Sequence, residues 1–181
     1  MTEEQQVLID SIRERAENLY RTRQHLCTDT VLLLFNEVFD GGLSEQQIIG
    51  LTSGFAIGMG ESGCLCGAVS GAAMALGLLL GEDGAYSRSP AIRKSVNQLH
   101  DQFKLAHKST CCRVLVKPVK DDPARHFDQC ARLTGDAAAQ AARILITQRP
   151  ELMERIRSDY LDRRDSAIKG RARRIFNRLF K

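Results

Sequence analysis

The feature that most constrains the fold is an apolar run from Cys66 to Leu80, CGAVSGAAMALGLLL, which contains no charged residue. A segment that is apolar on every side is stable in water only when other elements cover it on every side. The run is shorter than the ~20 residues that a bilayer core requires, and its glycines leave narrow flanks for neighbouring backbones. It therefore predicts a helix at the centre of a protein core rather than a membrane span.

Elsewhere the apolar residues recur with the period of amphipathic helices. The first helix is expected to bury a stripe that steps by four and three residues, namely Leu8, Ile12, Ala16 and Leu19. Further helices are expected from Pro150 onward and over residues 27–39, 44–51, 66–80, 89–106 and 123–146. No stretch alternates with a period of two. The predicted fold is therefore all-α, a helical bundle with a central Gly/Ala-rich buried helix and a basic C-terminal helix.

Charge divides the chain into two parts. The formal net charge is +4, and residues 151–181 hold ten basic and five acidic residues, so the preceding residues are close to neutral. We therefore expect a main domain over 1–149 and a basic amphipathic helical tail over 150–181. The apolar stripe of residues 167–181 is expected to pack on the bundle, with peripheral contact to an anionic membrane or a partner as the alternative. Nucleic-acid binding is not expected, because the main domain is not basic.

The N-terminal sequence MTEEQQVLIDSIRER is charged throughout, which favours a cytoplasmic protein over an exported one. The six cysteines are then expected to be free thiols, metal ligands or redox groups rather than structural disulfides. A chain of 181 residues can bury a core without disulfides. The cysteines are therefore the first place to look for chemistry.

The strongest local signal is the hexapeptide CGAVSG, residues 66–71, which lies between a glycine-rich loop, residues 58–63, and the apolar helix. Backbone N–H groups and the positive end of the helix dipole stabilise a thiolate at such a position. We therefore expect Cys66 to have a depressed pKa and to be alkylated readily; the alternative is a small side chain packed at the helix start. The loop lacks a nucleotide-binding pattern and is expected to form a tight turn beside the thiol.

This hexapeptide resembles the motif of the C_GCAxxG_C_C family of redox-active proteins, in which CGAxxG is accompanied by three further cysteines. Residues 66–68 and Gly71 match the motif itself. Cys27 matches the upstream cysteine, Cys112 matches the one in the segment HKSTCCRVL, and Cys130 matches the last. The resemblance covers residues 5–147.

The resemblance implies a redox role for the matched cysteines, and its similarity to the non-haem part of split-Soret cytochromes implies a labile iron–sulfur cluster. Four thiolates also suit zinc. We therefore expect a metal centre in which four thiols converge, namely Cys27, Cys66, Cys112 and Cys130. Haem is not expected, because the sequence contains no CxxCH motif.

Dithiol–disulfide exchange is the second use of these thiols that the sequence leaves open. Two additional thiols, Cys64 and Cys111, each lie next to a matched cysteine, and a disulfide within either close pair would be strained and easily reduced. In this form Cys66 and Cys112 are the expected catalytic thiols. We expect a redox partner protein, and a homodimer is one way for the cysteines to meet.

The rival hypothesis is a non-catalytic interaction module, in which the thiols stay buried and the basic tail binds a partner. His25 and His107 lie near matched cysteines, but they are expected to be ordinary helix-surface residues rather than metal ligands. An independent small-molecule enzyme is not expected, because neither a cofactor-binding motif nor an acid–base pair is visible.

Overall fold

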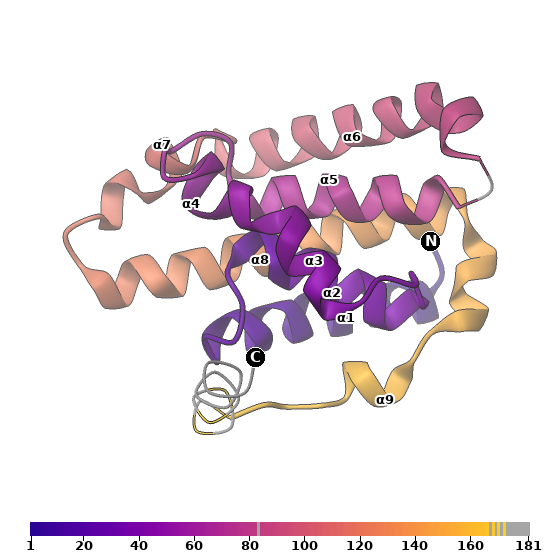
Figure 1. The fold of residues 1–181 in the computed structure, drawn as a ribbon, viewed down its shortest axis with the longest axis horizontal. Coiled ribbons are helices and arrows are strands. Elements are labelled where there is room, and N and C mark those ends of the chain that lie inside the picture. Colours follow the sequence, from indigo (N-terminus) through magenta and orange to yellow (C-terminus); the bar gives the residue numbers. More distant parts are fainter. Residues whose placement is uncertain (83, 167, 169, 171, 173–181) are drawn as a thin grey trace.

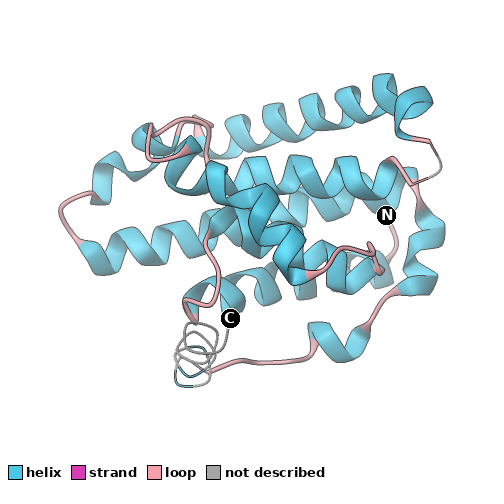
Figure 2. Cartoon of the chain, in the orientation of Figure 1, coloured by secondary structure: helices cyan, strands magenta, loops and turns pink. Residues whose placement is uncertain are grey.

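The structure is a computed structural model that describes residues 1–82, 84–166, 168, 170 and 172. In these residues all regular structure is helical and no strand occurs, which confirms the all-α class (Figure 2). None of the described helices combines the length and the apolar character that a membrane span requires. Most of the basic segment 167–181, whose apolar stripe is expected to pack on the bundle or to contact a membrane or partner, lies outside the described residues.

The helices follow one another along the chain in the order shown in Figure 1. Short 3₁₀-helices occupy Ser53–Phe55, Lys117–Val119 and Pro150–Arg155. The α-helices are α1 (Glu3–Arg21), α2 (Cys27–Phe39), α3 (Glu45–Thr52), α4 (Ala56–Met59), α5 (Gly67–Leu80), α6 (Ala85–His107), α7 (Cys112–Val116), α8 (Pro123–Gln148) and α9 (Ser158–Leu161).

Helix α5 lies inside the bundle, in contact with α2, α6 and α8 (Figure 1). This is the apolar run that the sequence places at the centre of a core. Its buried side chains are mostly small near the start and larger near the end: Ala68, Val69, Ala72, Ala75, Leu76, Leu79 and Leu80. Because small residues allow close helix packing, α2 approaches α5 closely near the N-terminal end of α5, at Gly67 and Gly71.

Helices α1 and α8 pack against each other over much of their length. The Gln5 backbone N–H donates to the Thr2 hydroxyl (3.2 Å), and Asp122 accepts from the first N–H groups of α8. These caps fix where the two helices begin and hence which residues face the core. The expected stripe of α1 is buried, namely Leu8, Ile12, Ala16 and Leu19.

Two helices differ from those that the sequence predicts. Helix α6 begins at Ala85 rather than at Ser89, so Pro90 lies inside it and removes one backbone hydrogen bond instead of starting the first turn. The continuous helix expected from Pro150 is a 3₁₀-helix, Pro150–Arg155, followed by the single turn of α9. Val114–Val116, outside the helices that the sequence predicts, lies in the short helix α7.

The segment after α8 folds back onto the helices. Leu152, Tyr160 and Leu161 belong to the same buried cluster as the residues of α1, α2 and α5. Arg155 forms an ion pair with Glu82, with N–O distances of 2.9 and 3.0 Å. The described part of this segment therefore contributes to the core.

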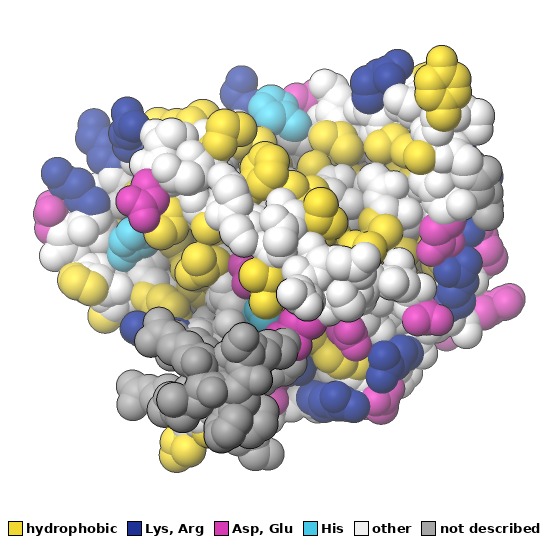
Figure 3. Space-filling view, viewed as in Figure 1, with side chains coloured by type: hydrophobic (Ala, Val, Ile, Leu, Met, Phe, Trp, Pro, Cys, Tyr) yellow, Lys and Arg dark blue, Asp and Glu magenta, His cyan; other side chains and the backbone are white. Residues whose placement is uncertain are grey.

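Figure 3 shows charged side chains mainly around the edge of one face, whereas hydrophobic and uncharged groups occupy much of its middle.

Candidate functional site

Four of the six cysteines line one small cavity of about 20 Å³ at the N-terminal end of α5. A cavity of this size has room for roughly one water molecule. The remaining lining residues are almost entirely apolar: Ala68, Leu115, Val116, Leu133 and Thr134. The four thiols are those that match the family pattern, namely Cys27, Cys66, Cys112 and Cys130.

Each of these thiols is placed by a different helix. Cys27 and Cys112 are the first residues of α2 and α7, Cys66 immediately precedes α5, and Cys130 lies within α8. The Cys66 N–H donates to the Thr110 carbonyl oxygen (2.8 Å), which ties the start of α5 to the segment before α7. Residues distant in the sequence therefore meet because helix starts converge at one end of the bundle.

The two glycines of the motif allow α2 and α5 to approach each other. A β-carbon at Gly71 would clash with the backbone oxygen of Thr28, and one at Gly67 would clash with the Cys27 sulfur. Gly77, farther along α5, has no neighbour within 4 Å of its β-carbon position. The motif glycines are therefore required by the close contact that brings Cys27 beside Cys66.

Burial keeps the clustered thiols protonated. It raises the pKa of Cys66 to about 12, with a smaller contribution from nearby Cys27, and it raises the pKa of Cys130 to about 11. The pKa values of Cys27 and Cys112 are also raised, mainly by burial. At neutral pH the metal-free cavity therefore holds thiols rather than thiolates.

The expected depression of the Cys66 pKa is wrong. Cys66 does occupy the position before a helix, and backbone N–H groups of Ala68 and Val69 act to lower its pKa. Its side chain is only 5% exposed, however, and the loss of hydration outweighs those hydrogen bonds. Burial also removes the accessibility on which the expected ready alkylation of Cys66 depends.

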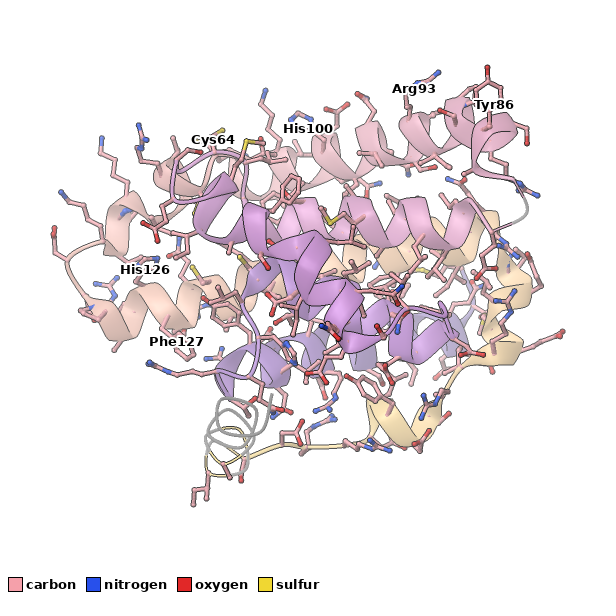
Figure 4. The ribbon with its side chains drawn as sticks, viewed as in Figure 1. Cys64, Tyr86, Arg93, His100, His126 and Phe127 are labelled. Carbon is pink, nitrogen blue, oxygen red and sulfur yellow. The ribbon has the colours of Figure 1, made fainter. Side chains whose placement is uncertain are left out.

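Sequence reasoning missed Tyr20, whose hydroxyl group is hydrogen-bonded to the Cys130 thiol. Burial and the neighbouring cysteines raise the Tyr20 pKa, so the phenol stays protonated and can donate this hydrogen bond. The Tyr20 ring stacks on the Phe127 ring, which is labelled in Figure 4, with a distance of 5.2 Å between the ring centroids. Nothing in the local sequence identifies this pair, because only the packing of α1 on α8 creates it.

The two additional cysteines lie outside the cavity lining. Cys64 is exposed, on the loop near α4 and α7 in Figure 4, and Cys111 is half-buried. The two thiols are hydrogen-bonded to each other, and this bond, together with backbone N–H groups of Val114 and Arg113, lowers the pKa of Cys111. Adjacent residues Cys111 and Cys112 therefore belong to different environments.

The donor set of the cavity suits a sulfur-preferring metal, because cysteine thiolates are the usual ligands of zinc and of iron–sulfur clusters. Within the described residues, however, no three His, Cys, Asp or Glu side chains are gathered as a single bound ion requires. In a four-iron or two-iron cluster the protein sulfurs bind different iron atoms, so they need not surround one point. A cluster therefore does not require the close gathering of side chains that a single ion requires.

The two histidines near matched cysteines do not line the cavity. His25 is buried, contrary to the expected surface position, and its Nδ1 lies 3.1 Å from an Asp29 oxygen. His107 Nε2 lies 3.4 Å from an Asp136 oxygen, at a separate cavity of about 480 Å³. Burial lowers the pKa of His107. His25 is therefore hydrogen-bonded to a carboxylate, whereas His107 Nε2 lies near Asp136 without a hydrogen bond to it.

Comparison with known proteins identifies the family of the chain. Residues 25–144, well over half of the chain, match the sequence model of the family described as "Putative redox-active protein (C_GCAxxG_C_C)". All four cavity cysteines and both motif glycines lie within the matched residues. No curated protein and no solved structure matches the chain significantly. The chain belongs to the C_GCAxxG_C_C family of redox-active proteins.

Proposed function

We propose that the four cavity cysteines hold an iron–sulfur cluster through which the protein exchanges electrons with a redox partner. The observation that carries this proposal is that four family cysteines from four separate elements line one small, largely apolar cavity. A bound cluster would supply one-electron transfer.

A cationic occupant would offset the raised pKa values of the cavity thiols. Cys27 and Cys112 each act to raise the pKa of Cys66 and of Cys130, so the four groups oppose one another's ionisation when no cation is present. Iron bound to the sulfurs would remove this repulsion and would displace the thiol protons. Loading is therefore expected to be pH-dependent and to require rotation of the thiol side chains, because the cavity has room for only about one water molecule.

The surrounding residues have defined roles in this proposal. Leu115, Leu133 and Ala68 limit the access of water to the sulfurs. Tyr20 donates a hydrogen bond to the Cys130 sulfur, and such bonds to ligand sulfurs tune the reduction potential of a cluster. Tyr20 is thus a positioning residue rather than a ligand.

The proposal is tested by purifying the full chain without air, reconstituting it with iron and sulfide, and measuring iron, acid-labile sulfide, zinc and visible absorption. The wild-type protein should contain iron and sulfide in a fixed ratio. Cys66→Ser and Cys130→Ser should each retain less than about a tenth of that iron. The matched variant Cys64→Ser, whose thiol lies outside the cavity lining, should retain its iron.

Three outcomes contradict the proposal. Wild-type protein that binds zinc without sulfide would show a single-ion site, and wild-type protein that binds no metal would leave dithiol chemistry as the use of the cavity. Equal iron loss in Cys64→Ser and Cys130→Ser would show that the ligand set is wrong.

A further inference from the structure

The loop before α5 and the segment before α7 are held side by side. The Arg113 N–H donates to the Gly63 carbonyl oxygen (2.9 Å), and the Arg113 guanidinium donates to the Ser62 carbonyl oxygen (2.6 Å). On the other side of Cys64, the Cys66 N–H donates to the Thr110 carbonyl oxygen (2.8 Å). These bonds fix the two segments in register, with Cys64 and Cys111 between the outer pairs.

The two thiols within this pairing are in contact. The Cys111 sulfur lies 3.1 Å from the Gly63 carbonyl oxygen, which belongs to the peptide group that joins Gly63 to Cys64. The Cys64 and Cys111 side chains are hydrogen-bonded to each other. Cys64 is exposed to solvent, whereas Cys66 of the cavity is buried. A reagent in solution therefore reaches this pair without entering the cavity.

We propose that Cys64 and Cys111 form a second redox site, a surface dithiol that exchanges with the disulfide of an external thiol compound. Neither residue belongs to the family pattern, and neither lines the four-cysteine cavity. The site is therefore separate from the proposed cluster and does not depend on it.

The exchange is a two-step transfer in which atoms and electrons balance. One thiolate of the pair attacks an external disulfide RS–SR, forms a protein–SR mixed disulfide and releases RS⁻. The neighbouring thiolate then attacks the protein sulfur of that mixed disulfide, closes the Cys64–Cys111 bond and releases the second RS⁻. The two thiol protons leave with the RS⁻ groups as two RSH, and two electrons pass from the protein to the external disulfide.

The test uses reduced, metal-free full-length protein incubated with oxidised glutathione, quenched with acid and mapped by peptide mass spectrometry. The expected product is a peptide pair linked through Cys64 and Cys111, at least about tenfold more abundant than any other linkage. Cys64→Ser and Cys111→Ser should each stop at a mixed disulfide with glutathione on the remaining thiol. The double variant should form neither product.

A parallel reaction with oxidised thioredoxin tests whether the disulfide that oxidises the pair is a protein disulfide or a small-molecule disulfide. Reaction with either supports the site. The proposal is overturned if Cys64 and Cys111 remain reduced with both reagents. It is also overturned if the principal linkage joins Cys111 to Cys112 or Cys64 to Cys66. Because the products are mapped without metal, failure of the iron–sulfur proposal leaves this result unaffected.

Discussion

The six cysteines form two groups that are neighbours along the chain but differ in burial and ionisation. The cavity thiols are covered by α2, α5, α7 and α8, and burial raises the pKa of each of them. In the surface pair, Cys64 is exposed and Cys111 is half-buried. The Cys64 thiol and nearby N–H groups lower the pKa of Cys111, whereas the Cys111 thiol raises the pKa of Cys64. Both groups include a thiol at a helix start, so the helix terminus alone does not decide ionisation.

The comparison shows that depth in the core outweighs the helix terminus. Cys66 precedes a helix of 14 residues and its pKa is nevertheless raised, whereas Cys111 precedes a helix of five residues and its pKa is lowered. Hydration of a thiolate is lost in the cavity and retained at the surface. We therefore expect the two groups to differ in chemistry, with metal binding inside and disulfide exchange outside.

Thiol alkylation should give the largest contrast between the two groups. A pKa of about 12 in place of 9.0 reduces the thiolate fraction of Cys66 at neutral pH by about a thousandfold. In reduced, metal-free protein, limited treatment with iodoacetamide should label Cys111, whose pKa is lowered, long before Cys66. Cys64, whose pKa is raised by Cys111 but which is exposed, should also react before Cys66. Peptide mass spectrometry measures the order, and unfolded protein in urea provides the control. Early labelling of Cys66 in the folded protein would contradict the account.

Substitution of a motif glycine should affect stability and should loosen the cavity rather than the surface pair. Gly71→Ala places a methyl group against the Thr28 backbone oxygen and should lower the free energy of unfolding by about 2–3 kcal/mol. Gly77→Ala is the matched control, because its β-carbon meets no neighbour within 4 Å. It should raise stability by roughly 0.5–1 kcal/mol. Urea denaturation measures both, and equal effects would show that the helix contact is misassigned.

Much of the fold follows from local sequence, but the depth of the thiols does not. Helical period, caps and the apolar run predict the all-α class because each depends on residues a few positions apart. The order of the cysteines and the CGAxxG motif identify the thiols that later meet in one cavity. Whether Cys66 is buried depends on how α2, α7 and α8 pack around it, and no local sequence pattern predicts that packing.

The pairing of Cys64 with Cys111 also could not be predicted from the sequence. It depends on the segment from α4 to the start of α5, in which Ile57, Met59 and Glu61 adopt positive φ values that are uncommon for residues other than glycine. The glycines at 58, 60 and 63 indicate a turn, but they do not indicate which segment it will contact. The contact of α1 with α8 that brings Tyr20 to Cys130 is likewise a property of the assembled bundle.

The pH dependence of the free energy of unfolding should report the raised pKa of the buried Cys66 thiol. Because the pKa of Cys66 is raised in the folded state, an unfolded chain loses its proton first as the pH rises. The stability of reduced, metal-free protein should therefore be retained below about pH 8 and fall as the pH rises from about 9 toward 12, by up to about 1.4 kcal/mol per pH unit from this thiol. Urea midpoints at pH 8 and 10 measure the decline. The stability of Cys66→Ala should decline less steeply with pH, and a decline identical to that of the wild-type protein would contradict burial of the thiol.

The smallest expected effect concerns Arg113, whose positive charge lies beside the surface pair. Arg113→Gln should slow the reaction with oxidised glutathione, which is an anion, by about two- to fivefold at low salt, and Arg113→Lys should restore part of the rate. Mass spectrometry of samples quenched with acid at successive times measures the rate at which the Cys64–Cys111 disulfide forms. Iron content should not change in Arg113→Gln, and a parallel loss of iron would indicate that the two groups are not separable.

The central claim, that four buried thiols form one centre and the surface pair another, is tested most directly by comparing two double variants. Both Cys64→Ser/Cys111→Ser and Cys66→Ser/Cys130→Ser are reconstituted anaerobically with iron and sulfide, and their iron and sulfide contents are measured beside the wild-type protein. The account predicts wild-type iron and sulfide in the first variant and almost none in the second. Loss of iron from the first variant, or its retention in the second, would contradict the division.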